Sequence, residues 1–345
     1  MRKLVPLLLT ISLFSSSAFA YGPRGHKLVG SIADKRLLRN RAVAKKVRKL
    51  LDGLTLEQVA TLPDNIKGWD DCRGSGNDNP VTTKERINDE LRAFWEANKC
   101  GKKPSHDIFH YTDVPVTGDE NYEDGKIGRD DFDVVQMIPF CIRVLKGEEP
   151  ETNERAITKA VAVILLTHYL GDIHQPLHVG AEYFNADGDP FHPTDGNEGF
   201  GDQGGNKLIL FTFWEGGLRS AGKLHSYWDG QTVKNAFGEE EAADPASAKR
   251  LARQTPAGWE LTGGTETWAR QMADEILPIA REARTRLRYE NVLIPSSGHE
   301  IKSGDAKEKP HDDGDFYAVW AAKMVRKEVH KGGWRLAALL EEALQ

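Results

Sequence analysis

Cysteine, basic charge and strand-forming patterns are all scarce in this 345-residue chain. With three cysteines it is not a disulfide-rich scaffold. Its formal net charge of −6 argues against a basic nucleic-acid-binding surface, so any attraction to phosphate would have to come from bound cations. No internal repeat and no linker between two self-contained halves is visible, and no N-glycosylation sequon is present. The 28% charged and 39% hydrophobic residues are typical of a globular protein.

The long apolar run at residues 1–20 has the pattern of a secretory signal peptide, with a basic start and a small-residue ending at Ala18 and Ala20. We expect cleavage after Ala20. The run is too short to span a membrane, so we expect a secreted or periplasmic protein with no membrane insertion. Cleavage would make Tyr21 the amino terminus, and its free α-amine, five residues before His26, could chelate a metal ion.

Export makes disulfide formation possible for the three cysteines. A bridge between Cys72 and Cys100 would close a polar segment rich in glycine and asparagine. Cys141 lies in an apolar helical stretch, where a buried free thiol is favoured. The sequence alone leaves the pairing open.

Helical periodicity dominates the chain. Apolar residues at three- and four-residue spacing predict helices at 28–51, 85–98, 133–146, 154–171, 265–288, 315–329 and 334–345. Pro139 and Pro278 should kink or split their helices. The segment 207–214, KLILFTFW, is the one convincing strand pattern. Polar loops are expected at 71–84, 181–205 and 292–314. The predicted fold is all-α: a single mostly helical domain at 21–345 with a small β-hairpin.

A run of eleven residues, HYLGDIHQPLH at 168–178, carries the main chemical signal. His168 and Asp172 are four residues apart in a helix, so their side chains share one face about 5–6 Å apart. Pro176 ends that helix ahead of His178. His225 and Asp229 repeat the same spacing, and together these donors outnumber the ligands of one tetrahedral zinc ion. Each histidine alone is more often an ordinary core residue, but the set predicts more than one metal.

Two further donors lie upstream. Asp64 follows Pro63 at a helix start, where a carboxylate is favoured and where a simple cap is an equally good interpretation. His110 lies in an extended hexapeptide, HYTDVP.

These residues, taken in order, resemble one family. Tyr21 to His26, Asp64, His110, the 168–178 motif, Gly204-Gly205-Asn206 and the segment 224–229 are similar to the zinc-dependent single-strand nucleases of fungi and the plant type I nucleases, within the phospholipase C/nuclease superfamily. The segment 333–340, GWRLAALL, is similar to that family's closing helix. The resemblance extends over essentially the whole mature chain.

The resemblance implies three zinc ions in a mostly helical fold. The implied ligands are Asp64, His110, His168 and Asp172 for the first zinc, Tyr21, His26 and Asp172 for the second, and His178, His225 and Asp229 for the third. It also assigns Asp113 to orienting the attacking water, Lys67 to the phosphate charge, and Tyr111 and Asn206 to substrate binding. For Tyr111 an alternative is core packing. His174 inherits no ligand role, and we expect it to make a supporting hydrogen bond.

The implied activity is hydrolysis of single-stranded DNA and RNA to 5′-phosphate products by a monomeric, exported enzyme, with 3′-nucleotidase activity. Two alternatives remain: a zinc phospholipase C, in which the last ligand resembles glutamate rather than Asp229, and an exported zinc-binding protein without turnover. The chain departs from the family in starting the mature protein with Tyr21 rather than tryptophan. Its span from Asp64 to His110 is also longer than the family norm, which puts substrate preference in doubt.

Overall fold

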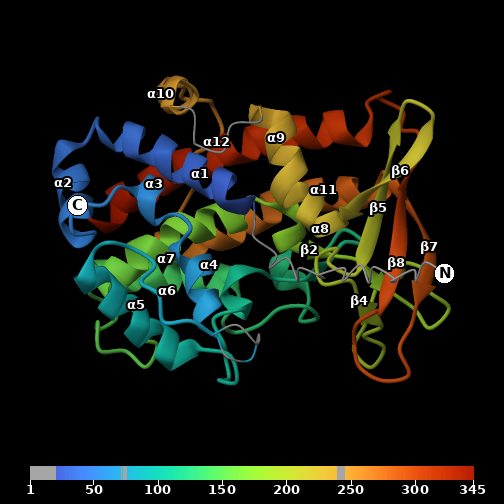
Figure 1. Ribbon diagram of the computed structural model, residues 1–345, viewed down its shortest axis with the longest axis horizontal. Helices are drawn as coiled ribbons and strands as arrows, with labels where there is room; N and C mark the ends of the chain where they lie inside the picture. The colour runs from blue at the N-terminus through green and yellow to red at the C-terminus, as the bar shows by residue number, and fades with distance from the viewer. Residues whose placement is uncertain (1–20, 71, 73–75, 239–244) are drawn as a thin grey trace, which may run out of the picture.

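The computed structural model describes residues 21–70, 72, 76–238 and 245–345. The signal peptide expected at 1–20 lies outside the described residues. Helices fill most of the molecule, and a four-stranded sheet stands at one end (Figure 1). The prediction of a single, mostly helical domain is confirmed. No helix within the described ranges is long and apolar enough to cross a membrane.

Helix α7 (Lys159–Asp172) is the central element of the core. Thr158 caps it by accepting a hydrogen bond from the Val161 amide, and every residue from Ala160 to Asp172 is buried. It is apolar on all sides because α1 (Gly22–Leu37), α6 (Val134–Lys146) and α12 (Tyr317–Ala343) pack around it. Its C-terminal end therefore carries the motif of residues 168–178 into the interior.

Smaller helices surround this core. Before the disulfide region lie α2 (Arg41–Leu50), α3 (Leu56–Val59), α4 (Leu62–Asn65) and η1 (Ile66–Trp69). After it come α5 (Glu85–Asn98), η3 (Ile108–His110) and η4 (Tyr122–Asp124). Further along the described part of the chain are η5 (Pro176–His178), α8 (Leu224–Ser226), η6 (Tyr227–Gln231), α9 (Thr232–Phe237), α10 (Pro245–Arg253) and η7 (Thr265–Thr267), followed by the longer helix α11 (Trp268–Thr285).

Several predicted helix boundaries were wrong. The stretch 28–51 forms two helices, because Asn40 caps α2 by accepting a hydrogen bond from the Val43 amide. The two segments at 315–329 and 334–345 form the single helix α12. Its glycines do not break it, because they let it pack closely on its neighbours: a Cβ at Gly333 would lie 2.7 Å from Ile32 Cβ. Neither Pro139 nor Pro278 splits its helix.

The sheet has the strand order β6-β5-β8-β7. The predicted hairpin is formed by β5 (Leu208–Trp214) and β6 (Gly217–Lys223). The strands β7 (Leu287–Leu293) and β8 (Ser303–Glu308) were not predicted, and β8 lies within the expected loop at 292–314. Strand β8 has the sequence SGDAKE, which has no apolar alternation, so only its pairing with β5 and β7 reveals it.

Two short strand pairs lie near the motif region. The strands β1 (Val114–Pro115) and β2 (Gly180–Ala181) pair in parallel, while β3 (Tyr183–Phe184) and β4 (Phe200–Gly201) pair antiparallel.

The cysteine prediction is confirmed: Cys72 and Cys100 form a disulfide, and Cys141 is a buried free thiol.

Candidate metal centre

The buried end of α7 supplies the first donors, His168 and Asp172, both with no exposed surface. Around them lie Asp64 from α4, His110 from the end of η3 and His26 from α1. Donor atoms of His26, His168 and Asp172 lie within 4.8 Å of one another, and so do those of Asp64, His110 and His168. We call these five residues the deep donor group. His110 ends a short helix rather than lying in an extended segment as expected.

Distances within the deep donor group are close to those needed for shared cations. His168 Nε2 lies 3.4 Å from Asp172 Oδ2 and 3.5 Å from Asp64 Oδ2. His110 Nδ1 lies 3.0 Å from Asp172 Oδ2, and His26 Nε2 lies 3.5 Å from Asp172 Oδ1. The Oδ2 atom of Asp172 therefore faces His168 and His110, and its Oδ1 atom faces His26.

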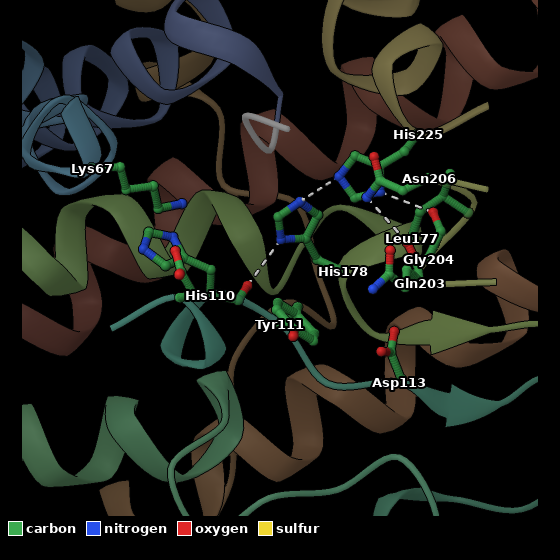
Figure 2. Close-up of a pocket in the computed structure, with 11 residues that line it drawn as sticks. Lys67, His110, Tyr111, Asp113, Leu177, His178, Gln203, Gly204, Asn206 and His225 are labelled. Carbon is green, nitrogen blue, oxygen red and sulfur yellow. Dashed lines mark hydrogen bonds between the residues drawn. The ribbon is translucent and has the colours of Figure 1, made fainter. Parts of the chain in front are cut away.

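A second cluster, the pocket donor group, consists of His178, His225 and Asp229, whose donor atoms also lie within 4.8 Å of one another. His178 comes from η5, His225 from α8 and Asp229 from η6. The two Nε2 atoms of His178 and His225 are 3.1 Å apart, and His225 Nε2 is 3.3 Å from Asp229 Oδ2. Figure 2 shows the two rings facing each other.

Backbone carbonyls fix the tautomer of three of these histidines. Nδ1 lies 2.7 Å from Ala60 O in His168, 2.9 Å from His110 O in His178 and 2.9 Å from Gly204 O in His225. Since a carbonyl only accepts, each Nδ1 carries the proton and each Nε2 keeps its lone pair. Ligating histidines in metalloproteins are oriented in this way.

Several buried polar atoms of these donors have no hydrogen-bond partner among the described residues. They are His168 Nε2, Asp172 Oδ1 and Asp229 Oδ2. Buried polar atoms are normally paired, and orphaned atoms that all carry lone pairs need a positive partner. Imidazole nitrogen and carboxylate oxygen are the donor types that zinc accepts. The residues therefore fit divalent cations.

The pKa shifts agree with this interpretation. Burial lowers the pKa of His168 to about 3 and that of His225 to about 4, so both rings are neutral, as ligands must be. Burial and the nearby Asp64 carboxylate raise the pKa of Asp172 well above its usual range when no cation is bound. A bound cation would reverse that shift by stabilising the ionised form.

Tyr21 lies beside the pocket donor group. It has no exposed surface, its backbone N–H donates to Asp229 Oδ1 at 3.2 Å, and its hydroxyl donates to the backbone carbonyl of His174. The His174 side chain donates from Nδ1 to Leu170 O at 2.8 Å, and this bond reaches no member of either donor group.

Two supporting residues were missed by sequence reasoning although both lie inside the motif. The Gln175 side chain donates to Asp229 Oδ1 at 3.0 Å and accepts from the Leu177 amide at 2.6 Å. Gly171 leaves room for His26, because a Cβ there would lie 2.6 Å from His26 Nδ1. The only sequence feature that could have indicated Gln175 and Gly171 was their position between the candidate ligands of the 168–178 motif.

The pocket above these groups has a volume of about 340 Å³. The sequence-predicted residues that line it are Lys67, His110, Tyr111, Asp113, His178, Asn206 and His225 (Figure 2). Lys67 Nζ donates to Asp64 Oδ1 at 2.7 Å. Tyr111 is 38% exposed, so it is not a core residue. The Asn206 amide donates to Gln203 O at 3.1 Å.

Asp113 lies on a different side of the pocket from Lys67 and His110 in Figure 2. Burial, with a further contribution from the nearby Asp202 carboxylate, raises its pKa to about 7. At neutral pH this carboxyl group therefore populates both protonation states, which suits a group that exchanges protons.

A further cluster, Asp70, His106 and Asp107, also has ligand spacing. Asp70 Oδ1 accepts from the Trp95 indole at 2.8 Å and the Cys100 amide at 3.3 Å, and His106 Nε2 lies 3.1 Å from Asp70 Oδ2. Both oxygens of Asp70 thus have protein partners. Because one partner is the amide of Cys100, this cluster stabilises the region around the disulfide.

The fold and site define a mostly helical protein with a buried histidine–aspartate metal-binding centre under an open pocket. It belongs to the S1/P1 nuclease family, whose family model matches residues 21–345.

Among curated proteins, the chain is similar to endonucleases of Arabidopsis thaliana, including endonuclease 5 and endonuclease 3. It is 24% identical to endonuclease 5 over 240 residues, which are 69% of this chain and 64% of that protein. It is 24% identical to endonuclease 3 over an alignment of 355 positions that covers 99% of this chain and 94% of that protein. The chain thus spans less than two thirds of the length of endonuclease 5.

Proposed function

We propose that this protein is a zinc-dependent phosphodiesterase that hydrolyses single-stranded DNA and RNA to 5′-phosphate products and also removes 3′-phosphates from nucleotides. The observation that carries the proposal is the pair of donor groups, with their unpartnered buried atoms, under a pocket that also presents a lysine and an exposed tyrosine. Family membership supports the same chemistry.

Three zinc ions would be held by the implied ligands. These are Asp64, His110, His168 and Asp172 for one, Tyr21, His26 and Asp172 for its partner, and His178, His225 and Asp229 for the third. When bound, zinc ions would offset the charge of the phosphodiester and lower the pKa of water toward neutrality. They would also make an acidic protein attractive to nucleic acid.

Lys67 would steady the charge of the phosphate. Its ammonium group lies at the pocket wall and is held by Asp64, so its position is fixed before substrate arrives. Preorganised charge of this kind stabilises the transition state without a reorganisation cost.

Asp113 would orient the attacking water and take its proton. With a pKa of about 7 it is substantially ionised above neutrality, and it lines the pocket. This role predicts that turnover rises as the pH passes through about 7, when the carboxylate form becomes available.

Tyr111 and Asn206 would bind the substrate. The exposed ring of Tyr111 can stack on an unpaired base, an interaction worth about 1–3 kcal/mol that tolerates any sequence. Stacking of this kind requires a splayed base, which favours single strands over a duplex.

Export is part of the proposal. A chain cut after Ala20 would be secreted or periplasmic and would act as a monomer, and the Cys72–Cys100 disulfide suits an oxidising compartment.

A substrate panel tests the function. We expect the processed protein to cleave single-stranded DNA and RNA faster than duplex DNA, and chelator to abolish cleavage. Cleavage of phosphatidylcholine alone would make the protein a phospholipase C. Tight zinc binding without cleavage of any substrate would make it a zinc-binding protein.

The role of Asp113 is tested by Asp113→Asn. Turnover should fall by about 10²–10⁴-fold and lose its rise near pH 7, while zinc content stays as in the native protein. Asp187→Asn, the same change on an exposed loop, is the matched control. Loss of zinc from the Asp113 variant would show that this carboxylate is a ligand instead.

A further inference from the structure

A buried arginine lies behind the pocket donor group. Arg284, near the end of α11, is 3% exposed, and its Nη1 is 2.7 Å from Asp202 Oδ2. Its Nη2 donates to Asp202 Oδ1 at 3.4 Å, so the guanidinium contacts both carboxylate oxygens. Asp202 has no exposed surface. A buried ion pair is costly to desolvate, so it often marks a position where geometry is important.

Asp202 organises the turn that follows it. Its carbonyl accepts from the Gly205 amide at 3.1 Å and the Lys207 amide at 3.2 Å. Its own amide donates to Glu182 O at 3.0 Å, and its Oδ1 accepts from the Glu182 amide at 3.2 Å. The segment 202–206 is therefore anchored at Asp202 through backbone and side chain together. We call this segment the 202–206 turn.

The 202–206 turn holds His225. Gly204 O accepts from His225 Nδ1 at 2.9 Å, and Gly205 O accepts from the His225 amide at 3.4 Å. Gly204 has a φ of +56°, and a Cβ there would lie 2.2 Å from Leu177 O and 3.3 Å from His225 Nδ1. The turn therefore packs closely between Leu177 and the His225 ring, and a side chain at Gly204 would clash with Leu177 and crowd the ring.

Arg284 acts at a distance from the pocket. It is absent from the residues that line the pocket in the described part of the chain, whereas Gln203, Gly204 and Asn206 of the turn are present. Among the described residues, the contacts that link Arg284 to the pocket run through Asp202 and the turn, while its charge adds to burial in lowering the pKa of His225.

We propose that Arg284 is a positioning residue for the pocket donor group: by clamping Asp202 it fixes the 202–206 turn, and the turn fixes the tautomer and direction of the His225 ring. This inference rests on the proposed function for the identity of the ion that His225 binds. It makes the geometry of the pocket donor group depend on a residue of α11, which is distant from that group in the sequence.

The first test measures metal retention against graded concentrations of chelator, in the native protein and in Arg284→Met. We expect the zinc of the pocket donor group to be released at roughly tenfold lower chelator concentration in the variant, with the deep donor group unchanged. The matched control is Arg286→Met. Arg286 is equally buried and two residues away, but it pairs with Glu282 and Asp313 rather than with the turn. Its loss should leave zinc release unaltered.

Arg284→Lys keeps the charge beside Asp202 but not the two-point contact, so it guards against a variant that fails to fold. It should show the same selective loss in milder form. The proposal would be overturned if folded Arg284→Lys and Arg284→Met released all their zinc ions at the same chelator concentrations as the native protein.

A metal-free measurement separates this inference from the proposed function. In histidine-labelled protein without zinc, the Nδ1 proton of His225 should exchange with solvent slowly in the native chain. In Arg284→Lys it should exchange at least about tenfold faster. Equal exchange in both would overturn the role of Arg284. If exchange were faster in the variant but the native protein cleaved no nucleic acid, the proposed function would be wrong and the positioning role of Arg284 would still hold.

Discussion

The two donor groups are built in different ways although both are shielded from solvent. The deep donor group is organised around one buried helix: α7 places His168 and Asp172 one turn apart, and His26 and Asp64 come from α1 and α4, which pack on it. The pocket donor group takes its ligands from the short segments η5, α8 and η6, with no long helix among them. Its geometry depends on supporting contacts from Gln175 and from Gly204 of the 202–206 turn.

This difference predicts different sensitivities. A helix inside a packed core is rigid, so the deep group should tolerate the loss of any single supporting hydrogen bond. Short segments have few contacts of their own, so the pocket group should lose affinity when one support is removed.

The largest effect should come from Asp172→Asn, which removes the carboxylate facing both sides of the deep group. We expect loss of the two deep zinc ions, retention of the pocket zinc and no detectable cleavage, measured by zinc analysis and nuclease assay. Loss of the pocket zinc as well would show that the two groups are not independent. Asp195→Asn, on an exposed loop, is the control.

The same variant has a stability signature in zinc-free protein. Because burial raises the pKa of Asp172 in the folded state, the folded chain binds a proton that the unfolded chain releases, and native stability falls as the pH rises above the unfolded value. Asparagine cannot ionise. Zinc-free Asp172→Asn should therefore melt at a higher temperature than zinc-free native protein at pH 8, and this advantage should vanish at low pH.

The second largest effect should come from one additional residue before Tyr21 in the processed protein. The amine would become a peptide nitrogen, which lacks the lone pair needed for coordination, so we expect loss of one deep zinc and most activity. Tyr21→Phe is the control, because it keeps the amine and loses only the hydroxyl bond to His174, with a cost of about 1 kcal/mol in stability. Native activity in the extended protein would rule out the amine as a ligand.

Gln175→Met should have an intermediate effect confined to the pocket group. It removes the bond to Asp229 Oδ1 while keeping most of the side-chain volume, so zinc affinity of that group should fall about 10–100-fold. Zinc release under graded chelator measures this. Equal weakening of the deep group would contradict the contrast between the two groups.

The smallest effect should come from Tyr111→Ala, because Tyr111 belongs to neither donor group. We expect binding of single-stranded DNA to weaken by about 1–3 kcal/mol, with zinc content unchanged. Tyr111→Phe keeps the ring and should bind as the native protein does. If Tyr111→Ala left the Michaelis constant for single-stranded DNA unaltered, base stacking at this position would be excluded.

Much of the fold was predictable where the local pattern and the tertiary environment agree. The amphipathic and fully apolar helices α5, α6 and α7 were located within a few residues. The strand β8 was not found, because its residues carry no apolar alternation and it exists only through pairing with β5 and β7. The continuity of α12 through Gly332 and Gly333 was likewise hidden, since close packing on α7 and α1 outweighs the low helix propensity of glycine.

The candidate site likewise has features that the sequence predicted and features that it did not. Spacing of four residues on a helix brought His168 together with Asp172, and the family resemblance supplied the remaining candidate ligands. The residues that orient the donors could not be predicted. Ala60 and Gly204 act through their backbone carbonyls and Arg284 through its charge, and no side-chain pattern indicates which carbonyl will face which histidine ring.

The sequence by itself determined the donor chemistry, because residue type decides which atoms can bind a cation and local spacing decides which of them share a helix face. Only the tertiary structure decided the protonation and direction of each donor, because burial holds the imidazoles neutral and distant backbone carbonyls select which nitrogen keeps its lone pair.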